Sequence, residues 1–200
     1  MSSSFWDQRY AGDELAYGEP PNEFLLSWSN QLPRAGSAVD LGAGEGRNAL
    51  FLASLGLDVL AVDQSVVGMR KAARLADERG LRLRTQEIDL ADFDVEHNSV
   101  DVVSSIFVHL PATLRATVHQ RVAAWLRPGG LFVLEAYAPD QIGRGTGGPR
   151  DVELLAPLET VVSELHGLKI EHQAALVRNV TEGRLHTGMA SLVQVVARKV

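Results

Sequence analysis

The chain has 200 residues, of which 46% are hydrophobic and 22% are charged, with a formal net charge of −6. This composition is ordinary for one soluble globular domain, and the negative charge argues against a nucleic-acid backbone as the main partner. The chain has no cysteine, which excludes disulfides, thiolate metal sites and a cysteine nucleophile. No apolar run approaches the roughly 20 residues that cross a bilayer, and the opening MSSSFWDQRY lacks the pattern of a secretory signal. We therefore expect a cytoplasmic protein without a membrane partner.

Short β-branched runs alternate with longer helical patterns through the first two thirds of the chain. The expected strands span residues 37–41, 58–62, 83–88, 99–107 and 131–138, and the expected helices span residues 46–55, 65–79 and 111–126. Strands that alternate with helices in this way imply βαβ units, and hence a parallel sheet with helices on both faces.

The pattern changes after Ala138. The stretch PDQIGRGTGGPR is too long for a tight connection, and such loops are often functional or mobile. A last helix over residues 157–165 and two strands over residues 168–177 and 191–197 follow it. Because a hairpin added to a parallel sheet makes a mixed sheet, we predict an α/β, Rossmann-like fold. Its seven-stranded sheet would be mostly parallel, with a C-terminal antiparallel hairpin and helices on both faces.

The loop after the first predicted strand, GAGEG (residues 42–46), is rich in glycine. Glycine lets a ligand approach the main chain closely, and ligands of open α/β sheets bind at the carboxyl ends of the strands. A P-loop is excluded because GxxxxGK[ST] is absent. In the dinucleotide pattern GxGxxG, Arg47 stands at the third glycine, and the Glu45 carboxylate would repel a pyrophosphate. The loop therefore disfavours a nicotinamide cofactor and suits S-adenosylmethionine (SAM), which carries a sulfonium cation and no phosphate.

Two acids follow later predicted strands. Asp63 ends the second strand about 20 residues after the first, where an acid accepts the ribose hydroxyls of NAD and of SAM alike. Asp89 closes QEIDL at the end of the third strand, and LRPGG precedes the fifth. In this order and spacing, VDLGAGEGRN, Asp63, the Asp89–Leu90 pair and LRPGG resemble the motifs of class I SAM-dependent methyltransferases.

The ends of the chain resemble one group within that family. FWDQRYAGDELAYGEPPNEFL (residues 5–25) is similar to the W-x-x-R-Y … Y-G … P-N-x-F-L opening of small bacterial methyltransferases related to the tellurite-resistance methyltransferase. GTGGPRD, EGRLHTG and LVQVVARK resemble the later part of the same group. The resemblance implies one domain over residues 1–200, with an N-terminal lid segment (residues 1–30), a SAM-binding core (residues 31–200) and a substrate loop near residues 138–152.

The resemblance also implies a set of cofactor contacts. These are Trp6, Arg9 and Tyr17 in the lid segment, Asp40, Gly42, Gly44 and Arg47 in the glycine motif, Asp63 with Gln64 at the ribose, Asp89 with Leu90 at the adenine, and Ser105 with Ile106 near the sulfonium. Arg9 suits the methionine carboxylate because a planar guanidinium pairs with it bidentately. The alternatives are that Trp6 and Tyr10 only pack a helix against the sheet edge and that Arg9 is a surface charge.

Histidine is the usual base at neutral pH, and the chain has six. His109 in FVHLP follows the fourth predicted strand, at the cofactor-facing edge of the sheet. His186 in EGRLHTG lies between the last two strands, and the relatives place a histidine in a similar G-x-L-H setting at the active site. Arg150 and Arg184 are candidates to attract an oxyanion. The other histidines are expected to be structural or exposed, and no ligand spacing indicates a metal site.

The leading hypothesis is a SAM-dependent methyltransferase that acts on a small thiol, a chalcogen oxyanion or a related metabolite. The alternatives are an enzyme of the same fold that methylates oxygen or nitrogen of a small metabolite, a SAM-binding sensor without catalysis, and a nicotinamide oxidoreductase. SSIFVHLP stands where an N-P-P-[YFW] motif would follow the fourth strand, which disfavours the DNA- and glutamine-methylating families. We expect a small-molecule substrate, no nucleic-acid partner, and a monomer or homodimer.

Overall fold

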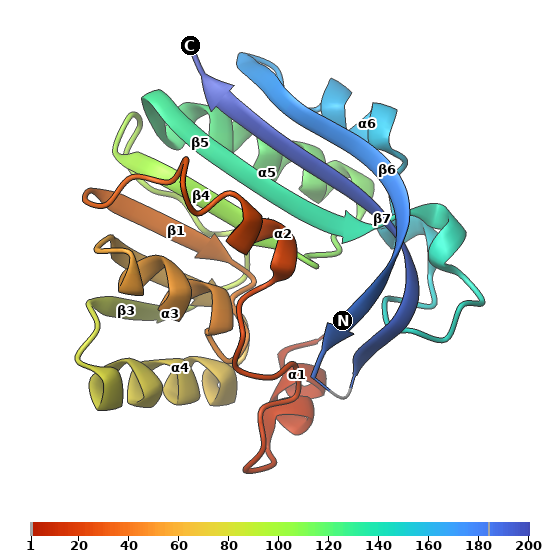
Figure 1. Cartoon of the computed structure of the whole chain (residues 1–200), viewed down its shortest axis with the longest axis horizontal. Helices are drawn as coiled ribbons and strands as arrows, with labels where there is room; N and C mark the ends of the chain where they lie inside the picture. Colours follow the sequence, from red (N-terminus) through yellow and green to blue (C-terminus); the bar gives the residue numbers. More distant parts are fainter. Residues whose placement is uncertain (1, 184) are drawn as a thin grey trace.

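The computed structural model describes residues 2–183 and 185–200, which form a seven-stranded sheet in the order β3-β2-β1-β4-β5-β7-β6 (Figure 1). The strands are β1 (Ser37–Leu41), β2 (Asp58–Asp63), β3 (Leu83–Glu87), β4 (Val100–Ile106), β5 (Leu126–Tyr137), β6 (Leu168–Glu182) and β7 (His186–Lys199). Strands β1 to β5 pair in parallel, whereas β7 runs antiparallel to both β5 and β6. The predicted mixed sheet with a C-terminal antiparallel hairpin is confirmed.

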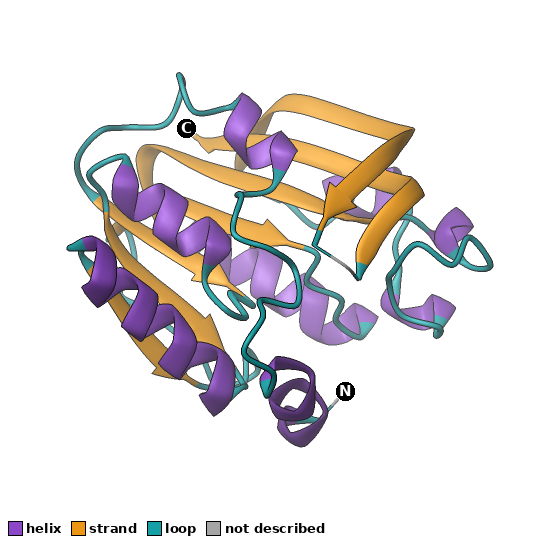
Figure 2. Ribbon diagram, turned by 60° about the horizontal axis from the view of Figure 1, so that its bottom comes forward, coloured by secondary structure: helices purple, strands orange, loops and turns teal. Residues whose placement is uncertain are grey.

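Helices cover both faces of this sheet (Figures 1 and 2). They are α1 (Ser3–Tyr10), α2 (Glu23–Ser27), α3 (Arg47–Ser54), α4 (Val66–Arg79), α5 (Ala112–Trp125) and α6 (Leu158–Ser163), with short 3-10 turns η1 (Pro139–Gln141) and η2 (Val152–Leu154). One hydrophobic core lies under α2, α3 and α4, and a second lies under α5 and α6. Over residues 2–183 and 185–200, no helix has the length and apolar character needed to cross a membrane.

Local sequence signals explain where the site-bearing elements begin and end. Gly46 has a φ of 89°, and a Cβ there would lie 2.6 Å from the Cβ of Ala72, so glycine allows α3 and α4 to approach closely. The Ser65 hydroxyl accepts a hydrogen bond from the Gly68 amide (3.1 Å) and caps the start of α4. Gly80, with a φ of 62°, ends the same helix in the left-handed conformation.

The last two strands are longer than the sequence predicts. Strand β6 continues beyond residue 177 to Glu182, and β7 begins at His186 rather than near residue 191. The added part of β6 carries charged residues, which resemble loop positions in a sequence. In the structure Arg178 and Glu182 form ion pairs near the sheet, so the strand continues through them. Strand β5 likewise begins at Leu126 and includes the RPGG stretch predicted as a turn.

A buried ion pair joins α5 to α6. Glu164, just after α6, accepts hydrogen bonds from the Arg115 guanidinium (2.9 Å) and from Nδ1 of His119 (2.9 Å). Burial opposes ionisation of Glu164, but the hydrogen bonds from His119 and Arg115 outweigh it, so the pKa of this carboxyl lies below its usual range. The pair anchors the segment that follows the long loop.

Replacing the carboxylate of Glu164, which links α5 to α6, should destabilise the fold. Glu164→Gln keeps the volume but leaves the buried Arg115 guanidinium without its counter-ion, and we expect the free energy of unfolding to fall by about 2 kcal/mol. Urea unfolding at pH 7 would measure the loss. Glu78→Gln, which breaks the exposed pair with Arg74 on α4, should change stability by less than about 0.5 kcal/mol.

The contribution of Glu164 should depend on pH in a defined direction. Because its pKa is lower in the folded than in the unfolded chain, its stabilisation is present above about pH 4.3, the ordinary glutamate value. The stabilisation is lost as the pH falls through the folded pKa. The difference between the native chain and Glu164→Gln should therefore shrink below pH 4, and a constant difference down to pH 3 would contradict this account.

Candidate active site

The carboxyl edge of the parallel strands gathers the predicted site. The glycine loop follows β1 there, Asp63 ends β2, and His109 follows β4. Because β7 is antiparallel to β5, its first residue, His186, lies at the same edge. In Figure 1, α1 and the free end of the β6–β7 hairpin both lie beyond this edge.

The glycine loop has the backbone conformation expected for close approach. Gly42 and Gly44 have φ values of 61° and 56°, in the left-handed region that favours glycine. A Cβ at Gly42 would lie 2.7 Å from Cγ2 of Val108, and one at Gly44 would lie 2.7 Å from the hydroxyl of Tyr10. The close approach at Gly44 is thus made by the lid segment.

Two buried carboxylates flank this loop. Asp63 accepts hydrogen bonds from the amides of Gly44 (2.9 Å) and Ser65 (2.8 Å), and burial raises its pKa against the effect of these amides. Asp40 accepts a hydrogen bond from the Ser104 hydroxyl (2.6 Å), and burial raises its pKa to about 7. Within the described part of the chain, Oδ2 of Asp40 is buried and has no hydrogen-bond partner. These acids leave acceptor capacity beside the loop.

The lid segment is held against the loop and the start of α4. Asp7 on α1 accepts hydrogen bonds from the Ser65 hydroxyl (2.6 Å) and the Val67 amide (3.2 Å), which places a negative charge at the N-terminus of α4. Tyr10, at the end of α1, is only 4% exposed, and burial raises the pKa of its hydroxyl. Tyr10 therefore packs between the lid segment and the core.

Glu45 of the glycine loop contacts the lid segment through both carboxylate oxygens. Oε2 accepts a hydrogen bond from the Ala16 amide (2.7 Å), and Oε1 pairs with the Lys71 ammonium at 2.8 Å. Lys71 also donates to the carbonyl of Gly12. The Glu45 carboxylate, whose negative charge disfavours a pyrophosphate, thus also holds the lid segment against the core.

The predicted lid residues form an aromatic layer around one guanidinium. The Arg9 guanidinium lies over the Phe5 ring (4.9 Å) and the Trp6 ring (5.7 Å) and donates a hydrogen bond to the Tyr17 hydroxyl (3.1 Å). Trp6 stacks on Tyr10 with ring centroids 5.8 Å apart. Trp6 and Tyr10 thus contact one another within α1, and the Arg9 guanidinium is engaged by side chains.

His186 lies in a cluster of aromatic rings. Its ring centroid is 4.4 Å from that of Tyr17, 4.6 Å from Phe107 and 5.5 Å from Tyr137. His109 stacks on the other side of Tyr137 at 5.5 Å and accepts a hydrogen bond from the Tyr137 amide (3.3 Å). We call these five residues the aromatic–histidine cluster. It joins the lid segment, the end of β4, β5 and β7.

Both histidines of the cluster are weak bases. Burial lowers the pKa of His186 to about 3, and the nearby positive charges of Arg47 and Arg9 lower it in the same direction. Burial likewise lowers the pKa of His109 to about 4. Nδ1 of His186 is buried without a hydrogen-bond partner among residues 2–183 and 185–200. The His186 ring is therefore neutral at physiological pH.

Arg47 connects the glycine loop to the hairpin. It is the first residue of α3, and its guanidinium pairs with Glu182 at the end of β6 and also contacts the Pro20 carbonyl (3.5 Å). Glu182 is the register partner of His186 across the hairpin. The side chain predicted as a cofactor contact is thus paired with a carboxylate at the free end of the hairpin.

Comparison with known proteins agrees with this geometry. Residues 38–130 match the family described as "Methyltransferase domain". These residues are a methyltransferase domain. The matched segment runs from β1 into β5 and includes the glycine loop, Asp63 and His109. Over these residues the predicted methyltransferase family is confirmed, and the comparisons support SAM as its cofactor.

Individual relatives match more of the chain at modest identity. A 2-heptyl-1-hydroxyquinolin-4(1H)-one methyltransferase of Mycobacteroides abscessus is 26% identical over 73% of this chain and 65% of its own length. A dimethylglycine N-methyltransferase of Parasynechococcus marenigrum is 31% identical over 72% of this chain and 58% of its own length. The chain spans from about a third to about two thirds of the length of the curated relatives it matches.

Among solved structures, TehB from Haemophilus influenzae has the same fold. It superposes with a TM-score of 0.74, at 16% identity, and the match covers 99% of this chain and 67% of TehB. At this identity the likeness concerns the fold alone.

Several of the remaining predicted residues lie at the carboxyl ends of β2, β3 and β4. Ser105 and Ile106 are buried at the end of β4, and Gln64 is half-buried between β2 and α4. Asp89 follows β3, is exposed and accepts a hydrogen bond from the Ala91 amide (2.9 Å), while Leu90 is buried. Arg150 is exposed on the long loop, and Arg184 lies outside the described residues. The assignment of all these residues to the cofactor or acceptor stays a prediction.

Sequence reasoning missed several residues of this edge. Phe107 and Tyr137 build the aromatic–histidine cluster, and Phe107 has a φ of 57°, which is unusual for an aromatic residue. Glu135 lies fully buried near the carboxyl end of β5. The charged residue inside the apolar run LFVLEAYA indicates a buried ionic contact. The strand pattern alone does not predict this contact.

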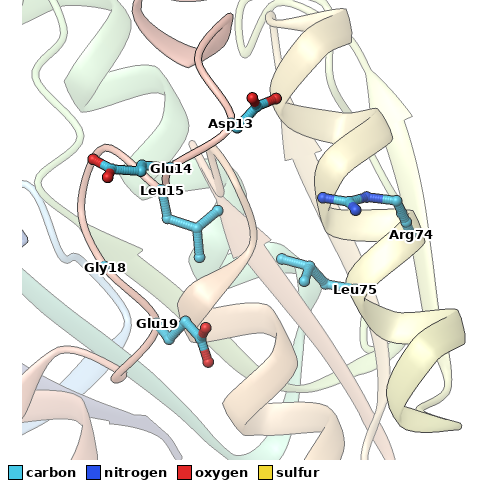
Figure 3. A pocket seen from close by; sticks show the side chains of 7 residues that line it. All are labelled: Asp13, Glu14, Leu15, Gly18, Glu19, Arg74 and Leu75. Carbon is cyan, nitrogen blue, oxygen red and sulfur yellow. The ribbon is translucent and has the colours of Figure 1, made fainter.

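An open groove lies outside this cluster, between the lid segment and α4 (Figure 3). It has a volume of about 540 Å³ and is lined by Asp13, Glu14, Leu15, Gly18, Glu19, Arg74 and Leu75. Its lining shares no residue with the predicted cofactor contacts. We therefore do not place the cofactor in it.

Removing the carboxylate at the end of β2 should weaken cofactor binding. For Asp63→Ala we expect the affinity for S-adenosylhomocysteine to fall by about 1–3 kcal/mol, or roughly 5- to 150-fold, because hydrogen bonds to a charged acceptor are lost. Isothermal calorimetry would measure the change. Asp58→Ala, at the exposed opposite end of the same strand, should bind like the native protein, and unchanged binding by Asp63→Ala would remove this residue from the site.

Proposed function

We propose that the protein is a SAM-dependent methyltransferase that transfers a methyl group to a small-molecule acceptor held at the aromatic–histidine cluster. The observation that carries this proposal is the meeting of the glycine loop and His186 at one edge of the sheet, joined through Arg47 and Glu182. A methyltransferase needs its cofactor loop and its acceptor site beside one another, because methyl transfer is an in-line displacement over about 3 Å.

The residues around the glycine loop fit SAM. The buried Asp63 and the Asp40 oxygen that has no hydrogen-bond partner among the described residues offer acceptors. Gly42 and Gly44 add no side chain of their own to the loop. The cation of the loop, Arg47, is paired with Glu182, so it does not provide a phosphate site. Gly42 and Gly44 would face the methionine moiety and Asp63 the ribose. Asp89 and Leu90 would lie at the adenine.

The chain's own residues would orient the acceptor, exclude water and take up a proton. When bound, SAM supplies the activated methyl group. Tyr17, Phe107 and Tyr137 exclude water from the site and provide ring faces for an apolar or soft acceptor. The buried Nδ1 of His186, which has no partner in the described part of the chain, can accept a hydrogen bond or a proton from the acceptor.

The low basicity of the cluster supports a thiol or a chalcogen oxyanion as the acceptor. With the pKa of His186 lowered to about 3 and that of His109 to about 4, neither ring removes a proton strongly. A thiolate or an oxyanion needs no strong base, whereas an alcohol or an ammonium group does. Methylation of oxygen or nitrogen is the second candidate, and the names of the quinolone and dimethylglycine relatives favour it.

The proposal includes the remaining predictions. These are the division into a lid segment, a core and a substrate loop, the monomeric or homodimeric state, the lack of a nucleic-acid partner and the cytoplasmic location. The long loop does contact the cluster, since a Cβ at Gly147 would lie 2.6 Å from the Tyr137 hydroxyl and 2.8 Å from the His186 ring. This contact is consistent with a substrate loop.

Cofactor choice is tested by calorimetry with S-adenosylhomocysteine and NADH in parallel. We expect micromolar binding of S-adenosylhomocysteine and none of NADH, because the loop carries an acid and lacks a free cation for a pyrophosphate. NADH binding, or no binding of either, would overturn the proposal. Cofactor binding without methyl transfer to sodium selenite, sodium tellurite, 2-mercaptoethanol or 2-heptyl-1-hydroxyquinolin-4(1H)-one would favour the sensor.

The role of His186 is tested by its removal. His186→Ala should lower kcat by about 100-fold while the affinity for S-adenosylhomocysteine stays within about twofold, because the ring acts on the acceptor and not on the cofactor. Stopped assays of S-adenosylhomocysteine release would measure kcat. His166→Ala, at an exposed turn, is the matched control. Native turnover by His186→Ala would show that this ring takes no part in the reaction.

A further inference from the structure

A buried ionic cluster beside the site has no part in the proposed chemistry. It consists of Glu135 on β5, Glu182 and Arg178 on β6, Arg47 on α3 and Asn22 before α2. Glu135 is fully buried and accepts hydrogen bonds from Arg178 (2.7 Å) and Asn22 (2.7 Å). Within the cluster two carboxylates face two guanidinium groups, and Arg178 also pairs with the exposed Glu23 at 2.7 Å.

Glu182 is the member of this cluster that faces the site. Its carboxylate pairs with Arg47 and accepts a hydrogen bond from the side-chain amide of Asn22 (2.8 Å), with Arg178 3.8 Å away. Asn22 also caps α2 by accepting the Leu25 amide hydrogen bond (3.0 Å). One carboxylate thus joins the glycine loop, the lid segment and the hairpin.

The position of Glu182 also fixes the place of His186. The two residues are register partners at the free end of the hairpin. The turn beyond Glu182 is packed against the lid segment, since Gly183 has a φ of 62° and a Cβ there would lie 2.5 Å from the backbone carbon of Tyr17. Tyr17 is also the ring nearest to His186. A shift of Glu182 would therefore move His186 and loosen its contact with Tyr17.

We propose that Glu182 is a positioning residue, which through its ion pair with Arg47 holds His186 at the glycine loop. The inference rests on the proposed function in that His186 acts on the acceptor. It gives the glutamate in TEGRLH and the arginine in GEGRN a joint role, because together they set the distance between the cofactor side and the acceptor side of the site.

The positioning role of Glu182 depends on its charge rather than on its volume. A glutamine at this position keeps the shape and can still accept the Asn22 hydrogen bond, but it loses the attraction to Arg47. Arg178 and Glu135 keep their own contact at 2.7 Å, so the sheet retains its other buried ion pair. Glu182→Gln therefore isolates the contact between the hairpin and the glycine loop.

A double-mutant cycle with His186 separates positioning from a general loss of structure. With sodium selenite or 2-mercaptoethanol as acceptor, Glu182→Gln should lower kcat about tenfold and leave the S-adenosylhomocysteine affinity within about threefold. In the His186→Ala background the same change should cause no further loss, because the group it positions is already absent. An equal loss in both backgrounds would show that Glu182 does not act through His186 and would overturn the proposal.

Glu171→Gln is the matched control. It removes the carboxylate of Glu171, which lies on the same strand and pairs with Arg198 at 2.6 Å. This ion pair is on the exposed side of the strand and away from the site. Its kcat should equal that of the native protein. If Glu182→Gln does not fold, Arg47→Gln breaks the same ion pair from the other side and should show the same loss and the same dependence on His186.

Hydrogen exchange makes the test independent of turnover. In Glu182→Gln, the amides of residues 180–182 and 186–188 should exchange at least tenfold faster than in the native protein, while Glu171→Gln should leave them unchanged. Unchanged exchange in Glu182→Gln overturns the proposal even if no acceptor is turned over. Faster exchange together with native turnover by His186→Ala would instead contradict the proposed function and leave the structural link between loop and hairpin in place.

Discussion

The carboxylates of Glu135 and Glu182 impose the main constraint on this structure, because both are buried at the edge where the site forms. A buried carboxylate is unfavourable unless cations and hydrogen bonds compensate it. Here the compensation comes from Arg47 and Arg178, which belong to the glycine loop and to the hairpin, and from Asn22 in the lid segment. The two buried carboxylates are therefore compensated only when the glycine loop, the hairpin and the lid segment have come together.

The lid segment and a bound cofactor depend on the same surface of the core. The Gly44 amide donates a hydrogen bond to Asp63, and the Tyr10 hydroxyl lies beside Gly44. Glu45 accepts a hydrogen bond from the Ala16 amide and pairs with Lys71. A ligand on the Cβ side of Gly44 would meet the Tyr10 hydroxyl, whereas the contact of Asn22 with Glu182 lies further along the chain. The position of the lid segment and access to the glycine loop are thus coupled through shared contacts, and the far end of the segment has its own anchor.

Much of the fold could be predicted from the sequence because it depends on local patterns. The alternation of strands and helices and the glycines of residues 42–46 are visible over a few residues, and so is Asp63 at a strand end. The contacts of Asn22 with Glu135 and Glu182 join residues 113 and 160 positions apart, and no local pattern encodes them. For the same reason the sequence predicts too short a hairpin, since the charges that look like a loop are satisfied by remote partners.

The aromatic–histidine cluster limits the chemistry that this edge can supply. Removing His186 from water and placing it near Arg47 and Arg9 lowers its pKa to about 3, so it stays neutral but is a poor base. A more hydrated histidine would be a stronger base, yet the water that raised its basicity would also compete with the acceptor for the methyl group. In the proposed function, the same burial favours acceptors that the protein does not have to deprotonate, such as a thiolate or an oxyanion. The packing of Tyr17, Phe107 and Tyr137 around the ring therefore argues for exclusion of water, rather than for strong base catalysis, as the contribution of this site.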